Sequence, residues 1–280
     1  MVATSQQSVL SECRPGPVAV LGIPFDQYSS FMRGPAKAPP IIRRTLHNGA
    51  SNLCAENGID LDGHPQMVDM GDLKLPDGDA ALDAIQAGVA ALAARGQRIL
   101  ALGGDHAITF PVVNALVERY DGLQILHLDA HPDLYDTFEG NRFSHACPFA
   151  RIMETGRISR LVQVGIRGMN TAQRRQADKF GVTCIEMKEF DPHRRIELAG
   201  PVYLSVDLDV LDPAHAPGVS HHEPGGMTTR DVVGLIQSIR APLVGADIVE
   251  YNPDRDPNGL TAAVAAKLFK EIAGTMLQSP

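Results

Sequence analysis

The sequence predicts an α/β protein built around a mainly parallel sheet. Short apolar runs rich in Val, Ile and Leu alternate along the chain with segments whose apolar residues recur at helical spacing. Strands that alternate with helices in this way form a parallel sheet with helices on both faces. At 280 residues and 44% hydrophobic content, the chain can bury a large core. We therefore expect a single domain over residues 16–280, preceded by a polar arm over residues 1–15.

The predicted elements begin with a strand in 17-PVAVLGIPFD, which leads into a loop punctuated by Pro and Gly. A helix is expected to start at the second proline pair of 34-GPAKAPPIIRRTL, because proline is tolerated in a first helical turn. Residues 78–95 predict a helix that begins with acidic residues and ends before Gly96, a suitable C-cap. The remaining strands are expected at about 97–102, 123–129, 160–166, 182–186, 201–207 and 243–249, and the remaining helices at about 108–119, 171–180, 229–239 and 260–277.

The composition argues against two classes of partner. Nucleic-acid binding needs a basic surface, and a chain with a formal net charge of −8 does not indicate one. A negative net charge is instead suited to a cationic ligand. No apolar stretch approaches the length of a membrane span. We therefore expect neither a nucleic-acid partner nor a membrane partner.

The cysteines and the first residues bear on the compartment. Cys13, Cys54, Cys147 and Cys184 show no C-x-x-C spacing, and the opening residues MVATSQQSVLSECRPG contain no apolar run of the secretory type. This pattern is typical of a reduced protein that is not secreted. The expectation that follows is a cytoplasmic location.

Three short segments carry most of the functional signal. The segments 103-GGDH, 127-HLDAHPD and 205-SVDLDVLD each follow an apolar, β-rich run. In extended backbone alternate side chains share a face, so the acidic residues of each segment point the same way. In parallel sheets functional groups collect beyond the carboxyl ends of the strands, which is where these segments fall. The predicted metal ligands are His106, Asp129, His131, Asp133, Asp207 and Asp209.

Charge makes a two-metal site the favoured interpretation of these segments. A single D-x-H or G-G-D-H is often structural, because Asp and Gly are common in turns after strands. Three such segments together are harder to explain that way. Four carboxylates in one pocket repel one another strongly, whereas two divalent cations cancel their charge.

Longer stretches around the ligands resemble a known family. The segments 127-HLDAHPDLYDTFEGNRFSHACPFARIME and 210-VLDPAHAPGVSHHEPGG are similar to those of the ureohydrolases, the arginases and agmatinases, and in particular to plant-type arginases and their bacterial relatives. The resemblance runs from about residue 17 to the C-terminus. It implies a three-layer α/β/α sandwich around an eight-stranded parallel sheet, two Mn²⁺ ions per chain, a small cationic guanidino substrate and a homo-trimer or homo-hexamer.

The resemblance also divides the ligands between the two metals. It implies that His106 and Asp133 bind the first ion and that His131 and Asp209 bind the second. The bridging positions then fall to Asp129 and Asp207. A carboxylate-rich set with two imidazoles and no thiolate suits manganese, while cobalt, nickel and iron(II) remain alternatives.

The expected chemistry is attack on the guanidino carbon by a hydroxide shared between the two metals. Asp133 is expected to accept a hydrogen bond from this hydroxide. The resemblance gives His145 the role of carrying a proton to the leaving amine, for which the pKa of histidine is suited. Glu250 ends an apolar run and offers a planar, charge-assisted match for a guanidinium. The structural alternatives are an ordinary loop histidine at His145 and a solvated rim carboxylate at Glu250.

The substrate is less well defined by the sequence. Animal-type arginases carry an Asn two residues after the fourth ligand and a Ser shortly before the shuttle histidine, whereas this chain has Tyr135 and 140-GNRF at these places. Plant-type arginases share this departure, so Asn141 and Arg142 are candidates for binding the α-carboxylate of arginine. Arginine is therefore the first expectation, followed by agmatine and then by another guanidino or formimino compound such as 4-guanidinobutyrate.

Two further classes are alternatives to a ureohydrolase. A deacetylase-like hydrolase would use a single zinc and a different ligand pattern, and a regulatory metal-binding protein without catalysis would be expected to lack His145 or a bridging aspartate. Neither matches the residues present. His127 is interpreted as a hydrogen-bonded core histidine. Four loop residues receive no assigned chemistry, namely His215, His221, His222 and Glu223.

Overall fold

The computed structural model describes residues 16–193 and 195–278, and its centre is one eight-stranded sheet. The strand order is β2-β1-β3-β8-β7-β4-β5-β6, and all neighbouring strands are parallel. The predicted α/β class with an eight-stranded parallel sheet is confirmed. The strands are β1 (Val18–Gly22), β2 (Met67–Asp72), β3 (Arg98–Leu102), β4 (Gln124–Leu128), β5 (Arg160–Ile166), β6 (Thr183–Glu186), β7 (Val202–Asp207) and β8 (Leu243–Val249).

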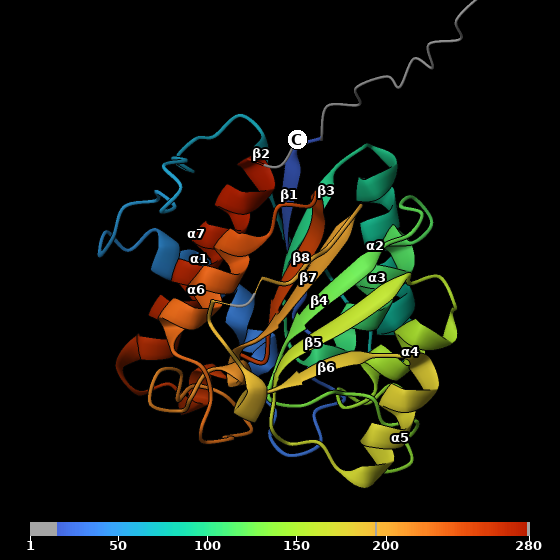
Figure 1. The fold of residues 1–280 in the computed structure, drawn as a ribbon. Helices are drawn as coiled ribbons and strands as arrows, with labels where there is room; N and C mark the ends of the chain where they lie inside the picture. Colours follow the sequence, from blue (N-terminus) through green and yellow to red (C-terminus); the bar gives the residue numbers. More distant parts are fainter. Residues whose placement is uncertain (1–15, 194, 279–280) are drawn as a thin grey trace, which may run out of the picture.

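Helices cover both faces of this sheet (Figure 1). Helix α7 packs against α1 and α6 on one face, and α2, α3, α4 and α5 lie on the other. Along β1, Val18 and Val20 belong to the core under the first face, whereas Ala19 and Leu21 belong to the core under the second, as period-two alternation requires. The helices are α1 (Ala38–Leu46), α2 (Ala80–Ala94), α3 (Thr109–Leu116), α4 (Pro148–Glu154), α5 (Thr171–Phe180), α6 (Thr229–Ser238) and α7 (Leu260–Gln278).

Two elements were not predicted, β2 and α4. Strand β2 lies at the edge of the sheet, and all its residues after Met67 are exposed, so its sequence MVDMGD lacks the apolar run of a buried strand. Helix α4 has only seven residues, too few to show helical periodicity clearly. The C-cap of α2 is Arg95 rather than the predicted Gly96, which follows it in the left-handed conformation typical of the next position, with a φ of 82°.

The sheet brings the predicted ligand segments to one edge. Strands β3, β8, β7 and β4 are consecutive in the order, and their carboxyl ends lie together because the strands are parallel. None of the described helices has the length and apolar character needed to cross a bilayer. The predicted arm at 1–15 lies outside the described residues, and the single domain over 16–280 stays a prediction.

Candidate metal centre

The first cluster of ligands surrounds a ring nitrogen of His106, which follows β3 in the short 3-10 turn η2 (His106–Ile108). Its Nδ1 atom lies 3.2, 3.0 and 3.1 Å from one carboxylate oxygen each of Asp129, Asp133 and Asp207. The nitrogen is buried, yet it has no hydrogen-bond partner among the described residues. Three carboxylate oxygens around an unpartnered buried imidazole nitrogen form a donor set that fits a cation.

The second cluster surrounds His131, in the loop after β4. His131 Nδ1 lies 3.0 Å from Asp209 Oδ2 and 3.6 Å from Asp129 Oδ1. The other oxygen of Asp209 accepts the Ala130 N–H at 3.1 Å, which fixes the carboxylate. Asp129 thus presents Oδ2 to the first cluster and Oδ1 to the second. Asp129 therefore belongs to both clusters, each of which could hold a cation.

Asp207 differs from Asp129 in its surroundings. Its Oδ2 faces His106, while its Oδ1 accepts the Asp209 N–H at 2.8 Å. Burial and the neighbouring carboxylates Asp209 and Asp129 raise the pKa of Asp207 well above its ordinary value. Burial and Asp129 also raise the pKa of Asp209 to about 6. Burial is the first cause of both raised pKa values, and repulsion from the neighbouring carboxylates adds to it. A divalent cation in each cluster would compensate the negative charge of these carboxylates.

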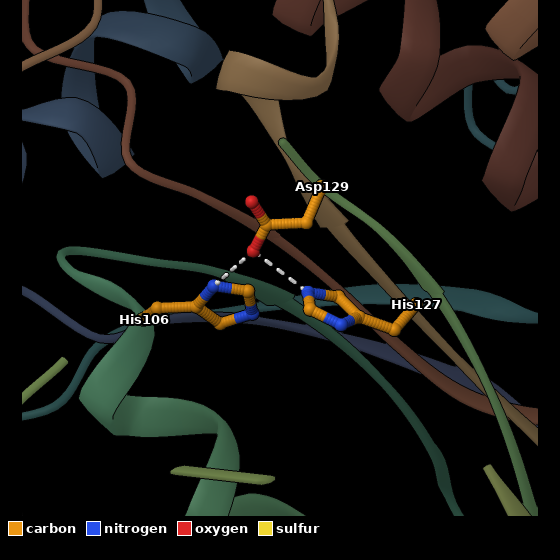
Figure 2. A group of neighbouring side chains, drawn as sticks. All are labelled: His106, His127 and Asp129. Carbon is orange, nitrogen blue, oxygen red and sulfur yellow. Dashed lines mark hydrogen bonds and ion pairs between the residues drawn. The ribbon is translucent and has the colours of Figure 1, made fainter. Parts of the chain in front are cut away.

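His127 also contacts Asp129, but its two ring nitrogens are both in use. Figure 2 shows the rings of His106 and His127 pointing at the same oxygen of Asp129. Gln163 donates its amide N–H to the Pro132 carbonyl at 2.6 Å and to His127 Nδ1 at 3.0 Å. His127 Nε2 therefore carries the proton and donates it to Asp129 Oδ2 at 2.8 Å. His127 is a hydrogen-bonded core histidine that orients Asp129.

A second group of partners orients His106 and was not foreseen. His106 Nε2 lies 2.9 Å from Ser205 Oγ, and the Ser205 hydroxyl donates to Asp247 Oδ1 at 2.7 Å. Asp247 Oδ2 accepts the hydroxyls of Tyr203 and Thr109, each at 2.7 Å. This network holds the proton of His106 on Nε2 and leaves the Nδ1 lone pair directed at the cluster. The alternation 203-Y-x-S-x-D indicated that Tyr203, Ser205 and Asp207 lie on one face of β7. It did not indicate that this face pairs with Asp247 of β8.

Glu250 and His145 lie beside the metal ligands. Glu250 Oε1 accepts the His106 N–H at 2.9 Å and the His145 Nδ1 proton at 2.8 Å. Glu250 Oε2 is buried and makes no hydrogen bond within the part of the chain that the structure describes. Burial lowers the pKa of His145, but Glu250, Asp105 and Asp133 outweigh this effect and raise it to about 9. The pair therefore offers one free carboxylate oxygen next to a cationic imidazole.

A pocket of about 160 Å³ lies beside His145. Glu250 is not among its lining residues, which include His131, Asp133, His145, Tyr135, Phe138, Gln173 and His221.

Like Glu250, the two other predicted substrate contacts are not among the lining residues of this pocket. The Arg142 guanidinium, half exposed, pairs with Glu154 Oε2 at 2.9 Å, and the Asn141 side-chain oxygen accepts the Phe143 N–H at 2.8 Å. Glu223 Oε1 lies 3.8 Å from His131 Nε2. Of the loop histidines, His221 lines the pocket and His222 donates to the Pro217 carbonyl at 2.7 Å.

This fold and this site define a ureohydrolase, a hydrolase that acts on C–N bonds. More particularly, the chain belongs to the arginase family, whose family model matches residues 16–274. It is 46% identical to "Arginase 1, mitochondrial" of Arabidopsis thaliana over 91% of this chain and 80% of that protein. It is 33% identical to the agmatinase of Bacillus anthracis over 91% of this chain and 90% of that protein. The solved arginase of Medicago truncatula matches with a TM-score of 0.89 at 43% identity, covering 94% of this chain and 88% of that one.

The expected cytoplasmic location is contradicted by these relatives. Arginases of Arabidopsis thaliana and Oryza sativa that match this chain are named mitochondrial or chloroplastic. The expectation was wrong because its two observations exclude only the secretory route. Transit peptides of organelles are amphipathic rather than apolar, so the lack of an apolar run does not test for them.

Proposed function

We propose that this protein is an arginase that hydrolyses the guanidino group of arginine to ornithine and urea with two Mn²⁺ ions per chain. The observation that carries the proposal is the position of the free, buried Glu250 Oε2 beside two ligand clusters that share Asp129. A guanidinium held by this oxygen would lie next to the source of the nucleophile. The high identity to plant arginases supports arginine as the substrate.

The two ions would be held by the six ligands in two sets. In this proposal His106 and Asp133 bind the first ion, His131 and Asp209 the second, and Asp129 and Asp207 both. A set of oxygens and two imidazoles without thiolate favours manganese. When bound by these residues, the two ions would lower the pKa of water towards neutrality and so supply the nucleophile.

Side chains of the protein then orient the substrate and the attacking water and protonate the leaving nitrogen. Glu250 Oε2 accepts hydrogen bonds from one or two N–H groups of the substrate and so orients the guanidinium. Asp133 accepts a hydrogen bond from the attacking water and aims it at the guanidino carbon. As the C–N bond breaks, its electron pair goes to the leaving nitrogen, and His145 gives that nitrogen a proton. The hydroxyl group that becomes the carbonyl of urea releases a proton in the same step, which returns His145 to its charged form. His145 is suited to this role because its raised pKa of about 9 keeps it protonated near neutral pH.

A urea assay with Mn²⁺ on arginine, agmatine and 4-guanidinobutyrate tests the proposal. We expect the largest kcat/KM with arginine. Turnover of agmatine alone would identify the protein as an agmatinase instead. Agmatinase is the second candidate because a bacterial agmatinase is among the relatives. We also propose a homo-trimer or homo-hexamer, which sedimentation of the purified protein would distinguish.

Replacing Glu250 with glutamine is expected to damage turnover of arginine and agmatine alike. One half of a charge-assisted pair is lost, and a hydrogen bond to a charged group contributes about 1.5–3 kcal/mol, or roughly 10–150-fold in kcat/KM. Steady-state kinetics on both substrates measure the loss. Glu118→Gln is the matched control, because Glu118 pairs with Arg157 at an exposed position. A loss confined to arginine would contradict guanidinium binding by Glu250.

Arg142 and Asn141 are proposed to contact the α-carboxylate of arginine. For Arg142 this role requires its guanidinium to exchange Glu154 for the substrate. Arg142→Ala is then expected to lower kcat/KM for arginine by about 1.5–3 kcal/mol, while agmatine, which has no carboxylate, is spared. Parallel kinetics on the two substrates make the measurement. Equal losses on both would assign Arg142 to the structure of its loop instead.

A further inference from the structure

Ser30 approaches His145 from the loop that follows β1. The Ser30 N–H donates to His145 Nε2 at 3.1 Å, and the Ser30 hydroxyl oxygen lies 2.8 Å from the same nitrogen. Two residues earlier, the Tyr28 carbonyl accepts the His145 N–H at 3.4 Å. The loop and His145 thus meet through three contacts across 115 residues of sequence, and Ser30 also lines the pocket.

Hydrogen bonds to residues 33–36 fix the part of the loop that follows Ser30. The Asp26 carboxylate accepts the N–H groups of Gly34 at 2.7 Å and Ala36 at 3.2 Å. The Asn252 amide, which is buried, donates to the Arg33 carbonyl at 3.3 Å. Gly34 has a φ of 146°, and a Cβ there would meet the Asn252 side chain. These contacts tie the loop to the segment after β8, which also carries Glu250.

The two Ser30 contacts differ in chemistry. The backbone N–H can only donate, so it fits an imidazole whose Nε2 carries a lone pair. The hydroxyl can donate to that lone pair or accept a proton from Nε2–H. Among the residues that the structure describes, it is the one hydrogen-bond partner of Nε2 able to accept. Nδ1 keeps its proton against Glu250, so Nε2 is the nitrogen whose protonation changes.

We propose that Ser30 is a positioning residue that holds His145 in both of its protonation states, its hydroxyl accepting from Nε2–H when His145 is charged and donating to Nε2 when it is neutral. The proposal rests on the proposed role of His145 as proton carrier. An imidazole that must gain and lose a proton in each turnover would otherwise lose its Nε2 partner in one of the two states. With the Ser30 hydroxyl present, the His145 ring keeps a hydrogen-bond partner at Nε2 in both states without reorienting.

Charged groups on four segments surround His145. Glu250 after β8, Asp105 after β3 and Asp133 after β4 favour its charged form. His221, in the loop after β7, lies with its ring centre 5.4 Å from that of His145 and opposes the charged form when it is itself protonated. Against this background the Ser30 hydroxyl adds an acceptor for Nε2–H, and acceptors of this kind stabilise the protonated state.

Ser30→Ala removes the hydroxyl and leaves the backbone N–H, which fits only neutral His145. We expect the pKa of His145 to fall by about one unit, a tenfold change in proton affinity. The alkaline limb of kcat for arginine should move down in pH by the same amount, and Ser30→Thr should restore both values. Ser159→Ala is the matched control, because the Ser159 hydroxyl donates to the Gly122 carbonyl at 2.7 Å and contacts neither His145 nor Asp105.

The pKa is measured by NMR of histidine-labelled protein loaded with Zn²⁺, which has a filled d shell, with the His145 signal identified by its loss in His145→Asn. This readout does not depend on turnover, so a chain that released no urea from any substrate would refute the proposed function while Ser30 could still be judged. An unchanged His145 pKa in folded Ser30→Ala, or a threonine variant that behaves like alanine, would overturn the proposal.

Discussion

Replacing Asp129 with alanine is expected to abolish urea release and to remove metal from both clusters. Asp129 presents one oxygen to His106 and the other to His131, so its loss removes a ligand from each cation position. Partners that only orient metal ligands already affect metal affinity by about 10–100-fold, and loss of a shared ligand should exceed that. Elemental analysis of the purified variant and equilibrium titration with Mn²⁺ measure the change.

The controls for this prediction separate charge from ligation. Asp136→Asn removes one negative charge from an exposed position in the same loop and should keep full metal content. Asp207→Ala tests the second proposed bridge, whose Oδ1 is already engaged by the Asp209 N–H. Full occupancy of both metals in Asp207→Ala would rule out bridging by Asp207 and leave Asp129 as the shared ligand.

Replacing His145 with asparagine is expected to leave both metals bound and to lower kcat by about 10²–10⁴-fold, the range for a positioned acid or base. His145 contacts Glu250 and Ser30 rather than the metal ligands, which is why metal content should hold. Its pKa is raised to about 9, so the charged form is present below that pH and is lost as pH rises through it. Wild-type kcat should therefore fall across this range, and the fall should be absent from the variant.

The control for His145 is an exposed histidine that does not line the pocket. His222→Asn changes an exposed ring that contacts the Pro217 carbonyl and Arg255, and its kcat should match the wild type. Kinetics over pH 6–10 with metal analysis at each step would make the comparison. A His145→Asn enzyme with wild-type kcat would return His145 to the class of ordinary loop histidines.

The sequence was most informative about where the ligands lie, at the ends of apolar runs. The extended backbone expected through Asp133 is not found, because β4 ends at Leu128 and Asp133 has a φ of 48°. The ligand segments turn as they leave their strands, and it is these turns that bring His131 and Asp133 to the pocket. Edge strand β2 escaped prediction because its exposed residues do not form an apolar run. The periodicity that marks a buried strand reports burial, and an edge strand with polar surroundings gives little of it.

The partners that orient the ligands were beyond sequence reasoning for a different reason. Gln163 reaches His127 because the two are register partners of β4 and β5, and Ser205 reaches Asp247 through the register of β7 and β8. Strand order and register follow from the packing of the whole chain, so no local pattern reveals them. The contact between Ser30 and His145 likewise joins two loops that are distant in sequence.

His106 contributes its ring to the first ligand cluster and its backbone N–H to Glu250, so a single residue sets the spacing between that cluster and the Glu250 carboxylate. Under the proposed function, this spacing would fix the distance between the guanidino group of a substrate and the nucleophile. Tyr135 and Gln173 line the pocket but take no part in this contact. Exchanging these lining residues is therefore expected to alter substrate preference while the spacing stays the same.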